Sequence, residues 1–376
     1  MSTGGYGLRV TGSVLRVTRC GLSVARRERR FTGPLVHRST GTLLHCFTAS
    51  LFCCSTATLL SQDIHFSQFF RTPMATAPAN IGQFDGAYRF SGVFRQQWRS
   101  VTKPYRTFGI GGDAKDVKKV EGLGLGAWLF NDRAGDSRMN TFRLNIGGSY
   151  TRFVDAAKKH AVTGGLQTGF TSISIDYSDL NFDAQYNGFY YDPSLDNNET
   201  FARDGLTHFD LHAGLGYHYV LEKRKRVDAG LSFYNLTTPT IGFMGGPGSP
   251  LDVRIAFNAI GQVPIADKVD VLPMLQWNRQ GKFREFILGG SVRFIQTEVM
   301  GLRRAVHLGG YWRWADAGYL FAGVEYDDWD IGISYDINVS ELVPASRNRG
   351  AFELTAVYIM GRSFSLPRYK ACPEQI

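Results

Sequence analysis

The chain has 376 residues with a formal net charge of +9, and 13% of its residues are aromatic. Residues 1–61 contain eight arginines and one acidic residue, whereas the rest of the chain has 34 basic and 32 acidic residues. A chain so nearly balanced after residue 61 lacks the clustered basic surface of nucleic-acid-binding proteins, so no nucleic-acid partner is expected.

Residues 1–61 have the pattern of an N-terminal leader. Arginines precede an apolar run at 43–60, which is the layout of a secretory signal peptide with cleavage after Ser61. The length before this run indicates that translation starts downstream of Met1. A mitochondrial transit peptide is one alternative, although the apolar block argues against it. A lipid-modified Cys53 or Cys54 is another, although bulky residues precede both.

Cys372 is the one cysteine after residue 61, which excludes an internal disulfide in the mature chain and disfavours a cysteine-based zinc site.

After the leader the sequence alternates between apolar and polar residues. In 141–151, Phe142 and Leu144 alternate with Arg143 and Asn145, and a period of two places successive side chains on opposite faces of a β-strand. No apolar run is long enough for a transmembrane helix. Fourteen segments are predicted as strands: 84–98, 105–115, 121–131, 138–153, 160–178, 206–220, 227–236, 252–264, 268–279, 283–296, 304–315, 318–327, 329–337 and 350–361.

These segments predict an all-β fold, a transmembrane antiparallel outer-membrane β-barrel of about 14 strands in contact with outer-membrane lipid. A soluble β-sandwich is the alternative, with a dry shared core and a charged outer face. Small and charged residues share one parity, for example Gly214 with Asp210 and Gly289 with Arg293. This mixture fits a water-filled or plugged lumen better than a dry core.

The predicted organisation has four parts. Residues 1–61 form the leader, 62–83 lie inside or below the barrel, 84–361 form the barrel, and 362–376 form a C-terminal periplasmic tail. If both termini are periplasmic, connections after odd-numbered strands face outward, and the two longest gaps, 179–205 and 237–251, both obey this rule.

Residues 207–220 contain three histidines, which raises the question of a metal site. His212 and His218 lie six residues apart on one face, about 20 Å along a strand, so they cannot share a metal ion. Ser291 and Ser334 are also predicted to face the lumen, but no spacing pairs either one with a histidine base. No catalytic residue, metal or cofactor is therefore expected, and the protein is not expected to be an enzyme.

Charged residues of both signs are predicted on the lumen face, where they neutralise one another around either a solute path or an inserted protein segment. The candidate polar residues of the lumen are Arg95, Arg143, His212, Arg254, Arg293 and Glu325.

Several separated motifs carry a resemblance to a known family. They are QDIHFSQFF at 62–70, FRQQW at 94–98, NDRAG at 131–135, SYDIN at 334–338 and ASRNRGAFELTAVYI at 345–359. Together they resemble the PorP/SprF family of type IX secretion and gliding-motility membrane proteins from Bacteroidetes-type bacteria, over residues 62–376. The family's N-terminal Asn-Pro-Ala-Tyr-Ala-Gly run has diverged here to Pro-Ala-Asn-Ile-Gly at 78–82.

The resemblance implies a non-enzymatic outer-membrane barrel. Such a protein assists the export or surface anchoring of a specific large secreted cargo with a C-terminal sorting domain, together with the type IX translocon and components of its periplasmic ring. The candidate cargo-contact residues in the two long loops are Tyr186, Phe189, Tyr190, Tyr191, Phe201, Phe243 and Met244. Packing of these side chains onto their own barrel rim is the alternative for the loops, and a passive porin or solute channel is the alternative function.

Overall fold

The computed structural model describes residues 64–361 except 98, 100–102, 136–137, 179, 223, 245, 300–301 and 341–347. The predicted leader at 1–61 and the predicted tail at 362–376 lie outside the described residues, as do Gln62 and Asp63 of the predicted lumenal segment.

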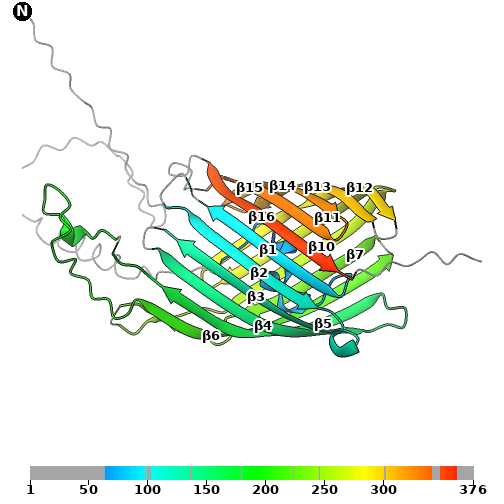
Figure 1. The fold of residues 1–376 in the computed structure, drawn as a ribbon, viewed down its shortest axis with the longest axis horizontal. Helices are drawn as coiled ribbons and strands as arrows, with labels where there is room; N and C mark the ends of the chain where they lie inside the picture. Colours follow the sequence, from blue (N-terminus) through cyan, green and yellow to red (C-terminus); the bar gives the residue numbers. More distant parts are fainter. Residues whose placement is uncertain are drawn as a thin grey trace, which may run out of the picture. The chain divides into compact units, whose positions relative to one another are not determined.

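Fourteen of the described strands form one closed antiparallel barrel, and β1 pairs with β16 to complete it (Figure 1). The predicted fold class is therefore confirmed. The barrel strands are β1 (Tyr88–Gln97), β2 (Tyr105–Ala114), β3 (Leu123–Ala134), β4 (Met139–Phe153), β5 (His160–Ser174), β6 (Gly205–Glu222), β7 (Lys225–Tyr234), β10 (Arg254–Ala266), β11 (Val269–Gln280), β12 (Phe283–Val299), β13 (Leu302–Arg313), β14 (Ala317–Tyr326), β15 (Trp329–Asn338) and β16 (Arg349–Met360).

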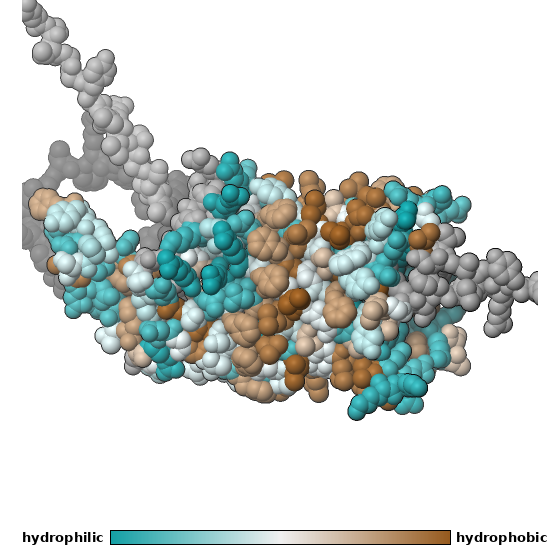
Figure 2. Space-filling model, viewed as in Figure 1, coloured by the Kyte–Doolittle hydropathy of each residue, from teal (hydrophilic) through white to brown (hydrophobic). Residues whose placement is uncertain are grey.

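The alternation in the sequence becomes the two faces of the barrel wall. In β15, Ile331, Ile333 and Tyr335 are exposed on the outside, whereas Ser334 and Asp336 are buried on the inside. Figure 2 shows apolar side chains gathered over the middle of the wall, with polar side chains toward both ends. A closed sheet with an apolar outer band satisfies every backbone group within a lipid bilayer.

The connections divide the barrel into two ends. The connections β5–β6 (175–204) and β7–β10 (235–253) are the longest described, and both lie at one end, called here the loop end. The second of these loops contains a short hairpin of β8 (Thr240–Ile241) and β9 (Ser249–Pro250). The opposite end has mostly short connections and is called the turn end.

An N-terminal segment, residues 64–83, lies inside the barrel. It contains η1 (Phe69–Arg71), α2 (Pro73–Thr76) and η2 (Pro78–Asn80), and most of its side chains are buried against the inner wall. Two further short turns, η3 (Val117–Lys119) and η4 (Asp183–Gln185), lie in connections. Within the described ranges, no helix has the length and apolar character needed to cross a membrane.

Candidate functional site

The N-terminal segment runs through the lumen from the loop end to the turn end. Ile64 and His65 line a cavity beside Gln97 and Tyr105, at the loop ends of β1 and β2. At its other end, the N–H of Gly82 donates to Asp113 near the turn end of β2, at 2.7 Å. The segment therefore occupies the lumen along the barrel axis rather than lying across one mouth.

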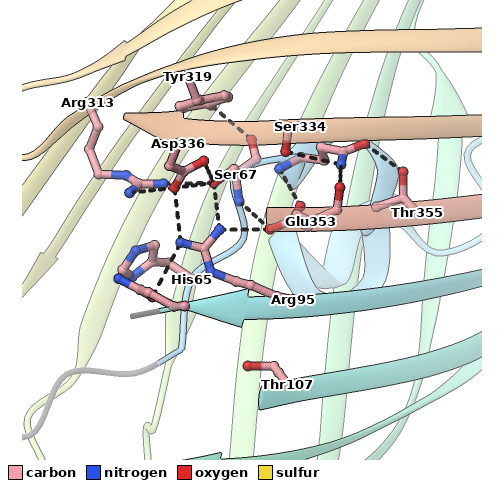
Figure 3. Close-up of polar contacts among 12 residues, drawn as sticks. His65, Ser67, Arg95, Thr107, Arg313, Tyr319, Ser334, Asp336, Glu353 and Thr355 are labelled. Carbon is pink, nitrogen blue, oxygen red and sulfur yellow. Dashed lines mark hydrogen bonds and ion pairs between the residues drawn. The ribbon is translucent and has the colours of Figure 1, made fainter. Parts of the chain in front are cut away.

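Toward the loop end, Ser67 of the segment contacts four buried charged residues, and the five together are called here the Ser67 cluster: Ser67, Arg95, Arg313, Asp336 and Glu353 (Figure 3). Arg95 forms ion pairs with Glu353 at 2.9 Å and with Asp336 at 3.1 Å. Arg313 forms a longer one with Asp336, at 3.4 Å. The Ser67 N–H donates to Glu353 at 2.9 Å, and its hydroxyl donates to Asp336 at the same distance. A neutral serine thus bridges charges from four strands.

The next residues of the segment extend this grip. The Gln68 N–H donates to Glu353 at 2.7 Å, and the Gln68 side-chain carbonyl accepts from the Thr355 hydroxyl at 2.6 Å. Arg71 forms an ion pair with Asp330 at 2.7 Å, and its guanidinium lies 4.9 Å from the ring centre of Phe321. The charge-assisted hydrogen bonds among these contacts are stronger than neutral ones, so they fix the position of the segment along the barrel.

Apolar side chains of the segment pack on opposite walls. Phe70 stacks on Tyr311 of β13, with ring centres 5.7 Å apart, while Phe69 belongs to a buried cluster on β11–β14. On the other side, Met74 and Ile81 pack with Trp128 of β3. The segment is therefore held between facing walls.

Glycines of the wall make room for the segment toward the turn end. A Cβ atom on Gly165 would lie 2.4 Å from the Pro78 carbonyl carbon, and one on Gly124 would lie 2.8 Å from the Ile81 carbonyl oxygen. The Ser149 hydroxyl also donates to the Ile81 carbonyl, at 2.6 Å. The small inward-facing residues of these strands thus accommodate backbone rather than water.

Three of the predicted lumen residues surround a small second cavity of about 40 Å³ beside the segment. Arg143 donates to the Thr171 hydroxyl at 2.7 Å and lies 3.6 Å from Asp210. The guanidinium of Arg254 lies 4.0 Å from the ring centre of Tyr234. His212 is fully buried. The remaining three lie elsewhere, because Arg95 belongs to the Ser67 cluster and Arg293 and Glu325 to a separate group.

The three histidines of β6 have separate partners. His208 lies 3.1 Å from Asp210, and the His212 Nδ1 accepts the Asn235 N–H at 3.1 Å. His218 pairs instead with a carboxylate of β7. Among the described residues, no group of three or more His, Cys, Asp or Glu side chains is arranged to hold a metal ion.

Arg293 and Glu325 lie in a network of wall residues near the turn end. Arg293 bridges Asp270 at 3.2 Å and Glu325 at 2.8 Å. Glu325 also contacts Arg303 at 2.7 Å and His307 at 2.9 Å. The ion pairs of this network run between residues of β11, β12, β13 and β14, so it braces the wall itself.

The seven predicted cargo-contact residues fall into two groups. Phe201 pairs with Met244 in an isolated β-bridge, and the Ala202 N–H donates to the Phe243 carbonyl at 3.0 Å. Phe201 also stacks on Tyr177, with ring centres 3.8 Å apart. These three residues therefore join the two long loops to each other.

The other four lie at the tip of the β5–β6 loop. Tyr186 and Tyr191 form a β-bridge, and the Asn187 side chain accepts the N–H groups of Phe189 and Tyr190 at 3.0 and 3.1 Å. This ordered turn leaves Phe189 91% exposed and Tyr190 63% exposed.

Just beyond the tip, the Ser194 hydroxyl and N–H both donate to Asp192 and hold the pKa of that carboxyl below its ordinary value of 3.8. The loop is thus shaped by its own hydrogen bonds.

Sequence analysis did not single out Ser67 and Gln68, whose contacts on β15 and β16 are more than 260 residues away along the chain. Two features of the sequence pointed to these contacts only indirectly. Residues 67–68 are polar between phenylalanines, and Asp336 falls on the inward-facing side of its strand.

A sequence model of the family described as "Type IX secretion system membrane protein PorP/SprF" matches residues 58–358. No curated protein sequence matches the chain.

Solved outer-membrane barrels are similar in fold. The toluene transporter TbuX of Ralstonia pickettii is 11% identical with a TM-score of 0.43, covering 76% of this chain and 92% of that chain. The Pseudomonas putida toluene transporter TodX is 11% identical with a TM-score of 0.45, covering 77% and 93%. BamA from Haemophilus ducreyi, lacking POTRA domains 1–3, is 9% identical with a TM-score of 0.38, covering 73% and 70%. Likenesses this distant indicate no substrate for this chain.

Proposed function

The chain belongs to the PorP/SprF family of type IX secretion membrane proteins and lies in the outer membrane, and we propose that it assists the export or surface anchoring of one large secreted cargo protein. The cargo carries a C-terminal sorting domain, and the type IX translocon and its periplasmic ring are the other partners. The protein serves the gliding or secretion machinery of a Bacteroidetes-type bacterium and performs no catalysis.

The observation that supports this proposal most is that the lumen holds the N-terminal segment while the β5–β6 loop exposes aromatic side chains. Residues 64–83 contact inner-wall residues from β1 and β2 around to β15 and β16, whereas Phe189 and Tyr190 project on an ordered loop. Exposed aromatic side chains on a fixed backbone are effective interface anchors, because little conformational entropy is lost when they bind. A barrel built this way acts through its loop end rather than by passing solutes.

The topology follows from the same proposal. Residues 1–61 are a leader with a secretory signal peptide, 62–83 are the lumenal segment, and 362–376 are a periplasmic tail. The loop end then faces the cell exterior, where the cargo emerges.

Quantitative mass spectrometry of surface and culture-medium proteins tests the function. A deletion strain should lose one or a few large proteins from its surface, or release them into the medium, and complementation should restore them. In the same assay, a Phe189→Ser/Tyr190→Ser variant should behave like the deletion while still assembling as a barrel. Leu195→Ser, in the same loop but away from the tip, is the matched control. An unchanged surface set in the deletion strain would contradict the proposal.

The alternative, a passive porin or solute channel, differs in a bilayer measurement. The purified full-length barrel should be nearly silent in planar bilayers because its lumen holds the segment. Steady conductance with an unchanged surface proteome would favour the channel instead.

A further inference from the structure

A cavity of about 540 Å³ remains in the loop-end mouth of the lumen, and Arg95 and Arg313 of the Ser67 cluster line it. Its volume falls in the range of about 300–1,000 Å³ that is typical of ligand sites. Ile64 and His65 of the segment line it together with residues of β1–β4, β12 and β13. The lining includes three aromatic residues and three carboxylates, Tyr105, Phe283, Trp314, Asp132, Glu285 and Asp316.

Asp132 is a buried carboxylate on this cavity wall. It is 8% exposed and accepts the Thr107 hydroxyl at 2.6 Å. Among the residues that the structure describes, no cationic side chain forms an ion pair with it, and Arg95 of the lining is paired with Asp336 and Glu353. A buried carboxylate with one neutral donor remains costly, which favours a cation beside it.

Glu285 on the facing wall differs from Asp132 because it has an arginine partner. It is 4% exposed, its Oε1 lies 3.2 Å from the Arg313 Nε, and its Oε2 accepts from the Asn278 side chain at 2.6 Å. Arg313 is shared, because Asp316 and Asp336 lie 3.0 and 3.4 Å from its Nη1. Arg284, the remaining cation of the lining, is an exposed residue. Asp132 is therefore the one carboxylate of this lining that has no arginine partner among the described residues.

We propose that the loop-end cavity binds a lysine-bearing peptide segment. The ammonium group contacts Asp132, whose described hydrogen-bond partner is the neutral Thr107 hydroxyl, because an ammonium is a compact charge with three donors. The aliphatic stem packs against Tyr105, which also offers an aromatic face to the cation. That the segment belongs to the secreted cargo rests on the proposed function, whereas the binding itself does not.

The test uses the purified full-length barrel in detergent micelles and a dye-labelled, end-blocked Gly-Ser-Lys-Ser-Gly peptide as the probe. Fluorescence anisotropy should show binding at least tenfold tighter than for the same peptide with acetyl-lysine. Asp132→Asn keeps the acceptor for Thr107 but removes the charge, and it should lower the affinity at least tenfold. Asp183→Asn, in the exposed β5–β6 loop, should leave the affinity unchanged.

Equal binding of the two peptides, no binding to the wild-type barrel, or an unchanged affinity of Asp132→Asn would each overturn the proposal. Binding that appears only after residues 62 and 63 are removed would also overturn it, because the chain itself would then fill the cavity. Heat-modified migration on a denaturing gel confirms that each variant is folded. A failed binding test beside an altered surface proteome would remove this site and leave the proposed function standing.

Discussion

The two ends of the N-terminal segment are held in different ways. At the loop end, Ser67 and Gln68 donate hydrogen bonds to charged carboxylates that the wall supplies. At the turn end, the backbone around Pro78 and Ile81 lies against wall positions that have no side chain, Gly165 and Gly124. The loop end of the segment is held by hydrogen bonds to wall carboxylates, whereas the turn end fits against wall glycines that have no side chain.

This difference determines how each end is weakened. A hydrogen bond to a charged group contributes about 1.5–3 kcal/mol, and its loss also leaves a buried partner unsatisfied. A close backbone approach has no such group to delete and is disturbed only when atoms are added. Removing a side chain should therefore weaken the loop-end contacts, and adding a side chain at a wall glycine should weaken the turn-end contacts.

The largest effect is expected from Glu353→Ala. Glu353 is fully buried and accepts from Ser67, Gln68 and Arg95, so its removal leaves a buried guanidinium with half of its carboxylate partners. Breaking a buried pair in this way costs about 3–5 kcal/mol. Urea unfolding of the barrel in micelles, followed by tryptophan fluorescence, measures the loss. Glu121→Ala, at an exposed pair with Lys158, should cost at most about 1 kcal/mol, and equal losses would contradict this account.

At the turn end, Gly165→Ala and Gly164→Ala form a matched pair of neighbours. The added methyl at Gly165 meets Pro78, whereas nothing lies within 4 Å of a Cβ at Gly164. Overpacking should destabilise Gly165→Ala by about 1–3 kcal/mol, while Gly164→Ala should be neutral or slightly stabilising because glycine weakens a strand. The same urea titration measures both. If the two variants unfold at the same urea concentration, the segment does not lie against Gly165.

The strand order and the inner face could be predicted because both depend on local pattern. Ser334 and Asp336 alternate with Ile333 and Tyr335 in the sequence as they do on the wall of β15. A period of two can be recognised from neighbouring residues alone, without knowing which distant residues pack together. The same local rule places Arg95 on the inside, but it does not say what Arg95 contacts.

The partners inside the lumen could not be predicted because they are non-local and aperiodic. Ser67 contacts Asp336 from a segment with no strand pattern, and its short helical turns are fixed by the wall around them. Gly165 and Gly214 fit a wet lumen and a filled one equally well until Pro78 is placed against them. Likewise, Phe201 and Phe189 are equivalent aromatics in the sequence, and they differ in the structure because Phe201 bridges to Met244 and stacks on Tyr177.

The division of the aromatic loop residues gives a smaller expected effect. Phe201→Ala removes the ring that stacks on Tyr177 beside the backbone bridge to Met244, and an aromatic pair contributes about 0.5–1.5 kcal/mol. Amide hydrogen exchange in both long loops should rise about two- to tenfold as a result. Phe189→Ala, at the exposed tip, should leave exchange unchanged although it weakens cargo retention. Faster exchange in the Phe189 variant would place that residue in the framework of the loop.

The smallest effect is expected at the turn between β4 and β5. The N–H groups of His160 and Lys159 donate to Asp155 at 2.7 and 3.0 Å, and they hold its pKa below the ordinary value of 3.8. Because the folded-state pKa is lowered, the stabilisation is present above the unfolded-state pKa and is lost as the pH falls through the folded-state pKa. Amide exchange of Lys159 and His160, corrected for its intrinsic pH dependence, should therefore be slow at pH 6 and accelerate below the ordinary pKa.

Asp155→Asn keeps one oxygen atom that can accept a hydrogen bond but removes the charge. The corrected amide exchange of Lys159 and His160 should therefore be faster than in the wild type at pH 6 and should not change with pH. The Thr151 N–H, which donates to the Gly122 carbonyl in the neighbouring connection, is the internal reference and should not respond. If the Thr151 amide accelerated together with the turn, the pH response would belong to the whole turn end of the barrel. Asp155 would then report general loosening rather than its own two hydrogen bonds.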